Sequence, residues 1–328
     1  MSWVLGVDSG GSGLRIALGS TASAEPAGVT TVATTSSAEP VRTGPAGIDA
    51  GHLLGQLLPA VDTLLAQAGA DSLSAITIGA AGMATLGDGL RAELPAALER
   101  SLGVGRLALA ADAVTAYAGA LGQRPGAVVA AGTGMIALGT DLTGWHRADG
   151  WGHLLGDCGG GAWIGRAGLE AALRAYDGRR GGSPALLSRM EAFFGPAPEL
   201  PGLLYPRADR PAVLASFAPE VARCAAADPV AAGILSVAAR QIAEAAAAVC
   251  PPSDESEVAL TGGLFKLGDP LLVPLRAELA DQLPHATTVS PAGDPLAGAL
   301  LIAAALATGS LRLPHDPRLL NALTQRDR

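Results

Sequence analysis

Short apolar runs alternate with longer segments of helical periodicity along most of the chain. The apolar runs at residues 4–7, 75–80 and 107–111 have the length and composition of buried strands. Between them, apolar residues recur at helical spacing over residues 49–69, and a second helix is expected over residues 89–102. Because strands alternate with helices, the pattern predicts an α/β fold with parallel sheet content.

The second half of the chain repeats this plan. The predicted strands are residues 128–131, 135–138 and 257–260, and the predicted long helices are residues 229–249, 271–283 and 296–308. A further helix should carry Leu169, Leu173 and Tyr176 on one face. Residues 178–211 contain six prolines, which predicts an irregular and mobile region with one short helix near residues 186–194.

Two Gly-rich turns each join a pair of apolar runs. The residues of the first turn are Gly10, Gly11, Ser12 and Gly13, and those of the second are Gly132, Thr133 and Gly134. Glycine lets backbone N–H groups approach a ligand closely, and a row of such groups forms a concavity that binds phosphate. Two such turns, about one small domain apart, predict two related halves that bind one polyphosphate.

Other phosphate-binding motifs fit this chain poorly. Its single lysine, Lys266, does not follow a GxxxxG run, so a Walker A loop is absent. Gly11 and Gly13 resemble the start of a dinucleotide-binding fingerprint, but Ile16 stands where the third glycine belongs. Residues 14–18 also read as a strand where that fingerprint needs a helix. Backbone N–H groups, hydroxyls, arginine and metal therefore remain as the means of binding phosphate.

Polar and small residues follow several predicted strands, at the edge where α/β sheets bind ligands. Asp8 could be a Mg²⁺ ligand beside a polyphosphate, or it could hydrogen-bond the local turn. Asp112 could take a proton from an attacking hydroxyl, or it could cap the following helix, and spacing does not separate these roles. Gly262 and Gly263 would let a nucleotide base or ribose lie against the backbone.

The Gly-rich segment 144–161 holds the remaining candidates. Asp157 could accept hydrogen bonds from sugar hydroxyls, or it could cap the next helix. The tryptophans in and just after this segment are Trp145, Trp151 and Trp163, which could form a platform for a sugar ring or belong to the core. His153 could be a base or a structural residue, and Cys158 is expected to be a buried, inert thiol.

Composition narrows the class of protein. The chain has 328 residues, of which 49% are apolar, so it can build the cores of two domains. A net charge of −8 argues against nucleic acid and anionic membranes as partners. Three cysteines without a CxxC pair fit a reducing cytoplasm. The N-terminus lacks the pattern of a signal peptide, and the longest apolar run, residues 296–307, is too short to span a bilayer. We therefore expect a soluble, cytoplasmic protein.

These stretches together resemble the superfamily of acetate and sugar kinases, hsp70 and actin. More narrowly, the chain is similar to the N-acetylglucosamine kinase members of the BadF/BadG/BcrA/BcrD ATPase family. The stretches that carry the resemblance are VDSGGSGLRIAL at 7–18, AD at 111–112, AAGTGMIALG at 130–139, GWGHLLGDCGGGAWIGRAGL at 150–169, LTGGLF at 260–265 and DPLAGALLIA at 294–303. The resemblance implies two ribonuclease-H-like domains of the actin-like ATPase fold, separated by a cleft that closes around substrate, and often a homodimer.

We expect these domains to be residues 1–113 and 114–328, with helix 296–308 packing back on the first domain. The resemblance implies ATP, Mg²⁺ and an amino sugar as ligands. It places Asp8 near Mg²⁺, residues 7–15 and 130–135 on the phosphates, and residues 260–265 on adenosine. It makes Asp112 the base that activates the sugar 6-hydroxyl. The residues implied to bind sugar are Gly150, Trp151, Gly152 and Asp157.

The chain departs from the family pattern at a few positions. Gly47 stands where relatives carry an Asn that helps to hold the sugar, Cys158 and Gly160 replace an acid and a hydroxyl, and Met135 replaces a Ser. These departures leave the sugar open between N-acetylglucosamine, glucosamine and another hexosamine or unfamiliar sugar. They also leave open a nucleotide-binding ATPase or sensor without kinase activity. The isolated cysteines disfavour a third reading, the iron–sulfur ATPase activator of a radical dehydratase.

Overall fold

The structure is a computed structural model that describes residues 2–10, 13–21, 28–44 and 47–323. It divides into two compact units, each built around its own sheet. The first unit comprises the described residues of 1–125, 140–145 and 290–328, and the second comprises residues 126–139 and 146–289. The predicted α/β class is confirmed.

A six-stranded mixed sheet forms the centre of the first unit. Its strands, in spatial order, are β13 (Leu320–Leu323), β7 (Leu107–Ala111), β6 (Ala75–Ala80), β1 (Ser2–Gly10), β2 (Gly13–Thr21) and β3 (Val29–Ser37). β1 is antiparallel to β2 and parallel to β6, and β6 is parallel to β7. The carboxyl ends of β1, β6 and β7 therefore lie along one edge of the sheet.

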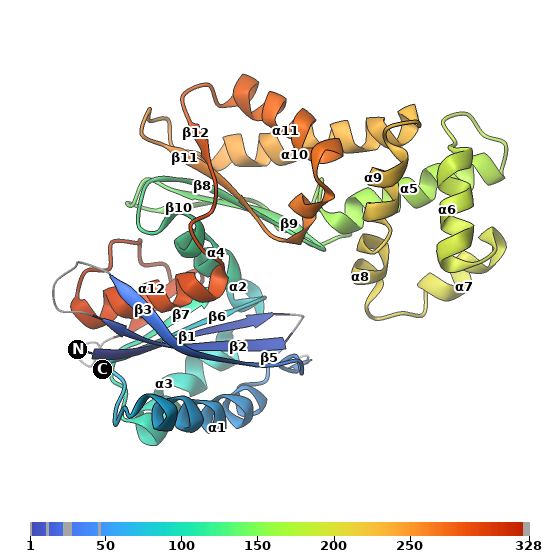
Figure 1. The fold of residues 1–328 in the computed structure, drawn as a ribbon. Coiled ribbons are helices and arrows are strands. Elements are labelled where there is room, and N and C mark those ends of the chain that lie inside the picture. The colour runs from blue at the N-terminus through green and yellow to red at the C-terminus, as the bar shows by residue number, and fades with distance from the viewer. Residues whose placement is uncertain (1, 11–12, 22–27, 45–46, 324–328) are drawn as a thin grey trace. The chain divides into compact units, whose positions relative to one another are not determined.

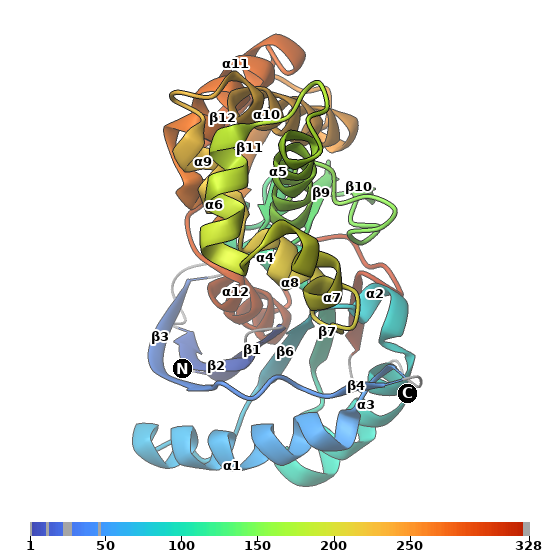
Figure 2. The same ribbon diagram turned by 90° about the vertical axis from the view of Figure 1, so that its right-hand side faces the viewer.

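Helices cover both faces of this sheet (Figures 1 and 2). The helices on one face are α1 (Ala50–Ala68) and α3 (Asp88–Leu102), and those on the other are α4 (Asp112–Leu121) and α12 (Pro295–Thr308). A short helix α2 (Met83–Leu86) and a two-stranded ribbon, β4 (Thr43–Gly44) and β5 (Gly47–Ile48), complete the unit. Helix α1 begins as predicted, because Asp49 accepts a hydrogen bond from the His52 N–H, and it ends at the left-handed Gly69.

Glycines let α12 approach its neighbours closely. A Cβ at Gly6 of β1 would lie 2.6 Å from the Leu300 nitrogen, and one at Gly298 would lie 1.9 Å from the Thr115 oxygen. The contacts thus group α4 and α12 with the first sheet. Residues 114–125 are expected in the second domain, and the division at residues 113 and 114 stays a prediction.

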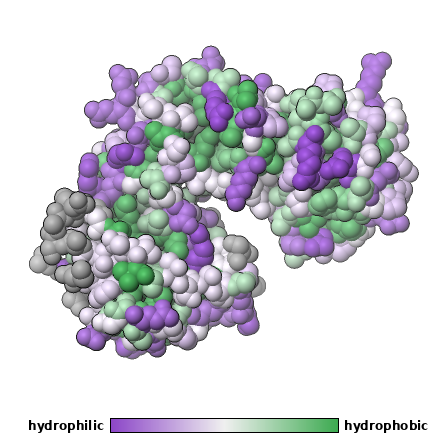
Figure 3. Space-filling model, viewed as in Figure 1, coloured by the Kyte–Doolittle hydropathy of each residue, from purple (hydrophilic) through white to green (hydrophobic). Residues whose placement is uncertain are grey.

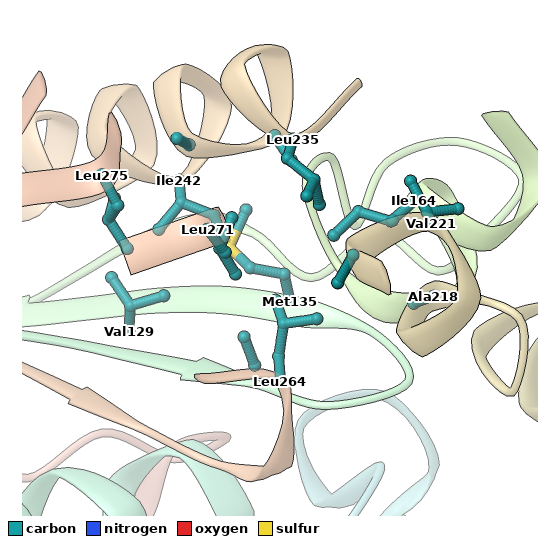
Figure 4. Close-up of a cluster of buried hydrophobic side chains, with 14 of the residues drawn as sticks. Val129, Met135, Ile164, Ala218, Val221, Leu235, Ile242, Leu264, Leu271 and Leu275 are labelled. Carbon is teal, nitrogen blue, oxygen red and sulfur yellow. The ribbon is translucent and has the colours of Figure 1, made fainter. Parts of the chain in front are cut away.

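A five-stranded sheet forms the centre of the second unit. Its strands, in spatial order, are β10 (Trp145–Asp149), β9 (Met135–Thr140), β8 (Gly126–Ala131), β11 (Glu257–Thr261) and β12 (Thr287–Val289). Helices α10 (Pro229–Val249) and α11 (Asp269–Gln282) pack on it, and Figure 4 shows Ile242, Leu271 and Leu275 directed toward Val129 in the core between these layers. The short 3₁₀ helix η2 (Gly263–Leu267) follows β11.

Several of the remaining helices of the second unit lie in a region that was predicted to be irregular. They are α5 (Gly161–Tyr176), α6 (Pro184–Phe194), the 3₁₀ helix η1 (Ala197–Glu199), α7 (Leu200–Leu204), α8 (Arg210–Ala215) and α9 (Ala218–Cys224). The short helix predicted near residues 186–194 is α6, but the expectation that the rest of residues 178–211 is irregular was wrong, because η1, α7 and the start of α8 lie there. The prolines of this region start helices instead of breaking them, because Pro184, Pro201 and Pro211 occupy first-turn positions where no backbone donor is needed.

Within the described residues, α10 is the one helix long and apolar enough to cross a membrane. Its apolar residues Leu235, Ile242 and Val249 are buried in the core of the second unit. Packing inside the unit therefore accounts for the apolar character of this helix.

Candidate functional site

Two of the predicted site carboxylates lie at one edge of the first sheet. In the strand register Ser9 lies beside Ala80 and Ala80 lies beside Ala111, so Asp112 begins just past the row that contains Ser9. β1 and β7 are separated by β6 alone, which places them about 10 Å apart. Asp8 and Asp112 therefore belong to the edge at which α/β sheets bind ligands.

Asp112 is the first residue of α4 and is exposed to solvent. The cap position is Ala111, so the capping role considered for Asp112 is not the one observed. The Oδ1 atom of Asp112 accepts a hydrogen bond of 2.9 Å from the Ala113 N–H. Desolvation by the surrounding protein raises the pKa of Asp112 to about 6, and the charge of Asp8 adds to this, whereas the Ala113 N–H opposes it. A carboxylate of this pKa that water can reach suits proton transfer near neutral pH.

The Asp8 carboxylate is held by Arg15, which lies opposite it on β2. Arg15 Nε and Nη2 donate to Asp8 Oδ2 at 3.0 and 2.6 Å, and Arg15 Nη1 donates to Asp294 Oδ2 at 2.5 Å. Asp294 also caps α12 by accepting from the Ala297 N–H. Among the described residues, the side chain of Asp8 thus bonds a guanidinium, not the turn backbone. The ion pairs of Arg15 with Asp8 and Asp294 were not predicted from the sequence.

The first Gly turn is described only at its ends. Gly10 and Gly13 lie opposite each other at the end of the β1–β2 hairpin, and Gly11 and Ser12 lie outside the described residues. Gly13 has φ +124°, and a Cβ there would lie 2.1 Å from the Ser37 oxygen. Close passage of β3 therefore requires glycine at position 13.

The second Gly turn is held against the start of α5. The Gly161 N–H donates to the Gly132 oxygen at 2.9 Å, and the Ala162 N–H donates to the Thr133 oxygen at 2.8 Å. Gly262 follows β11 beside this turn, because Thr261 pairs with Ala130 and a Cβ at Gly262 would lie 2.2 Å from the Ala131 oxygen. A Cβ at Gly263 would meet no atom within 4 Å. The structure thus brings Gly132, Thr133, Gly134, Gly262 and Gly263 to one edge of the second sheet.

A loop after β10 carries Asp157 and is held by Asp149, which sequence reasoning missed. The Asp149 carboxylate accepts from the Asp157 N–H at 2.5 Å and from the Cys158 N–H at 2.9 Å. The Gly152 N–H donates to Asp157 Oδ1 at 2.9 Å. Gly150 and Gly152 have φ of +72° and +86°, which favours glycine at both positions. The Asp149–Gly150 pair, a common turn dipeptide, was the available signal.

Asp157 lies against the second Gly turn. A Cβ at Gly134 would lie 2.3 Å from Asp157 Oδ2. Desolvation raises the pKa of Asp157, and the Gly152 N–H opposes this. The cap of α5 is Gly160, so the capping role considered for Asp157 is not observed. Cys158 is half-buried, not fully buried as expected. Desolvation and the charge of Asp149 raise the pKa of its thiol, which agrees with an inert cysteine.

The three tryptophans of this segment have different surroundings. Trp145 packs edge-to-face on Tyr117 and donates from Nε1 to the Pro314 oxygen, and Trp163 packs against the core of the second unit. The side chain of Trp151 is 64% exposed, with Arg147 over its ring at 4.2 Å. Trp151 is therefore the tryptophan of this segment that a ligand can reach.

At two of the positions where this chain departs from the family pattern, the surrounding backbone leaves no room for a side chain. Gly47 has φ +98°, and a Cβ there would lie 2.3 Å from the Leu86 oxygen, so an Asn does not fit without a backbone shift. A Cβ at Gly160 would lie 2.8 Å from the carbonyl carbon of Gly134. Met135 is buried in the core of the second unit. Packing in this chain thus favours glycine at positions 47 and 160.

The two sheets, with glycine turns and acidic residues at their edges, define an α/β protein of the actin-like ATPase class. Residues 5–303 match the model of the BadF/BadG/BcrA/BcrD ATPase family, and the chain belongs to this family. The predicted family is confirmed.

Solved structures agree with this assignment. A candidate N-acetylglucosamine kinase of Chromobacterium violaceum is 30% identical, with a TM-score of 0.67 over 94% of this chain and 99% of that one. A ROK family glucokinase of Streptomyces griseus, solved with glucose and AMPPNP, is 21% identical with a TM-score of 0.52 over 94% of this chain and 99% of that one, and shows the fold alone.

A curated relative matches a shorter segment. The N-acetylmuramic acid/N-acetylglucosamine kinase of Clostridium acetobutylicum is 40% identical over 114 residues, which are 33% of this chain. The match spans about a third, 35%, of the length of that relative.

Proposed function

We propose that this protein is a sugar kinase that transfers the γ-phosphate of ATP to the 6-hydroxyl of an amino sugar, N-acetylglucosamine or glucosamine. The observation that carries the proposal is Asp112, a solvent-accessible carboxylate with a pKa of about 6 at the ligand-binding edge of the first sheet. The names of the relatives in Chromobacterium violaceum and Clostridium acetobutylicum support an amino sugar as the substrate.

Each glycine-rich element receives one role in this proposal. The residues proposed to bind the phosphates of ATP are Gly10, Gly11, Ser12, Gly13, Gly132, Thr133 and Gly134. Gly262 and Gly263 would lie against adenosine. A Cβ at Gly263 would meet no atom within 4 Å, which leaves room for the nucleoside, whereas Gly262 is packed against Ala131. The residues proposed to bind the sugar are Gly150, Trp151, Gly152 and Asp157, with Asp112 on the reacting hydroxyl. Asp157 is held by Gly152 and can accept hydrogen bonds from sugar hydroxyls.

Asp8 is the residue proposed to hold Mg²⁺. Both bonds from Arg15 reach Oδ2, which leaves Oδ1 without a partner among the described residues. A single carboxylate suits Mg²⁺, which keeps several waters and takes phosphate oxygens as further ligands. The described residues contain no cluster of three or more His, Cys, Asp or Glu that could hold a metal ion, which agrees with a metal bound mainly by nucleotide. Bound Mg²⁺ would neutralise charge on the phosphates.

Asp112 is proposed to act as the base. Its carboxylate accepts the proton of the sugar hydroxyl as the hydroxyl oxygen forms a bond to the γ-phosphorus and ADP leaves. Positioning and charge neutralisation supply the rest of the rate enhancement, as is usual for phosphoryl transfer. A homodimer, as the family resemblance implies, and a cytoplasmic location, as the cysteine content indicates, are part of the same proposal.

The test is an ADP-release assay with a panel of hexoses and hexosamines, in which ³¹P NMR identifies the phosphorylated position. The proposal expects release that depends on an amino sugar and a 6-phosphate product. Release with glucose alone, or a product phosphorylated elsewhere, would contradict the proposed substrate. Nucleotide binding without sugar-dependent release would instead favour the alternative of an ATPase or sensor.

A further inference from the structure

The helical part of the second unit contains a cavity that no proposed substrate explains. Its volume is about 560 Å³, within the range of small-molecule sites. Its walls come from α5, from α7 and α8, and from His153 and Leu154 of the loop after β10. None of the residues that we assign to ATP, Mg²⁺ or sugar lines it. Figure 3 shows apolar and hydrophilic surface side by side over this part of the molecule.

The floor of the cavity is apolar. It is formed by five leucines: Leu169, Leu173, Leu200, Leu204 and Leu214. Tyr205, whose side chain is 76% exposed, adds an aromatic wall. A saturated chain or an aromatic ring is the kind of group that such a floor removes from water.

Charged side chains stand at the rim of the cavity, and ion pairs with neighbouring residues neutralise only some of them. Arg179 at the rim pairs with Asp177, and Glu170 at the rim pairs with Arg174. The remaining arginines of the rim, Arg166 and Arg210, have no carboxylate partner among the described residues, and Arg210 donates to the Tyr205 oxygen at 3.3 Å. Two uncompensated guanidinium groups beside an apolar floor favour a ligand with an apolar body and an anionic end.

We infer that this cavity binds an amphipathic carboxylate, with its apolar part on the leucines and its carboxylate on Arg166 and Arg210. The planar guanidinium matches a carboxylate in two parallel hydrogen bonds, which makes this head group the natural partner of the rim. The site is separate from the proposed kinase chemistry, so its test measures binding directly and needs no phosphoryl transfer.

Calorimetric titration of the full chain with octanoate tests this inference. One saturable site is expected. 1-Octanol has the apolar chain without the charge, and acetate has the charge without a long apolar chain. Each should bind at least tenfold more weakly than octanoate. Octanol binding as tightly as octanoate would overturn the role of the arginines. Octyl phosphate binding tenfold more tightly than octanoate would overturn the carboxylate assignment.

Variants locate the site. Arg166→Gln with Arg210→Gln should weaken octanoate binding about tenfold or more, the effect of one hydrogen bond to a charged group. Both side chains are exposed, so the fold should survive, and circular dichroism checks it. Arg240→Gln, an exposed arginine of α10 that does not line the cavity, is the matched control. Equal affinity in the double variant and this control would overturn the inference.

Discussion

The two glycine turns look alike in the sequence, yet the described residues beside the first turn form an ion pair, whereas backbone bonds join the second to α5. Beside the first turn, Arg15 joins Asp8 to Asp294 through charge-assisted hydrogen bonds. The second turn is joined to α5 by N–H groups that donate to Gly132 and Thr133. Similar turns can therefore have different surroundings, because charged side chains flank the first, whereas Asp157 lies against the second.

The largest expected effect is the loss of turnover when Asp112 of the first unit is replaced. Asp112→Asn should lower turnover by about a hundredfold or more, because the amide cannot accept the hydroxyl proton, while ATP still binds. ADP release and nucleotide titration measure the two properties. Asp71→Asn, a change of an exposed aspartate just before β6, is the matched control. Equal turnover in both variants would remove Asp112 from the chemistry.

The pH dependence of turnover should report the same group. Because the deprotonated form of Asp112 accepts the proton, kcat should be near its maximum above the pKa of about 6 and fall as the pH drops through it. One unit below that pKa, about a tenth of the activity should remain. The pH–rate profile measures this, and a flat profile between pH 5 and 7 would contradict it.

In the second unit, substitution of Asp149 should lower the affinity for the sugar. Asp149→Ala leaves the N–H groups of Asp157 and Cys158 without their acceptor, so the loop loses its geometry. We expect the KM for sugar to rise about tenfold, the effect of one charged hydrogen bond, with little change in the KM for ATP. Asp149→Asn keeps one acceptor oxygen and should recover part of the affinity. An equal rise in both KM values would contradict a role of Asp149 that is confined to the sugar site.

The smallest expected effect is a loss of stability when Gly47 is replaced. Gly47→Ala places a Cβ against the Leu86 oxygen at a φ that favours glycine, and should lower the free energy of unfolding by roughly 1–3 kcal/mol. Gly44→Ala, in the same ribbon, meets no atom within 4 Å and is the matched control. Urea unfolding compares them, and equal midpoints would show that the backbone tolerates a side chain at position 47.

Most elements were predictable because their signals are local. Strand β7 and helix α10 have the predicted bounds, since a short apolar run and a long helical periodicity each depend on neighbouring residues. Short helices α7 and α8 escaped prediction, because proline was read as a breaker where it occupies the first helical turn. β13 escaped because its pairing with β7 joins residues more than two hundred positions apart.

For the candidate site, the sequence by itself determined which residue types stand at or after the strands: Asp8 near the end of β1, Asp112 after β7, the glycine turns and the Asp157 loop. The tertiary structure decided what surrounds them. Only folding brings Asp294 to Arg15, 279 residues away in the chain, and Asp112 to a place where the surrounding protein raises its pKa. The propensity to form a helix or strand depends on adjacent residues. Ion pairs and desolvation depend on groups that are distant in sequence and meet only in the folded chain.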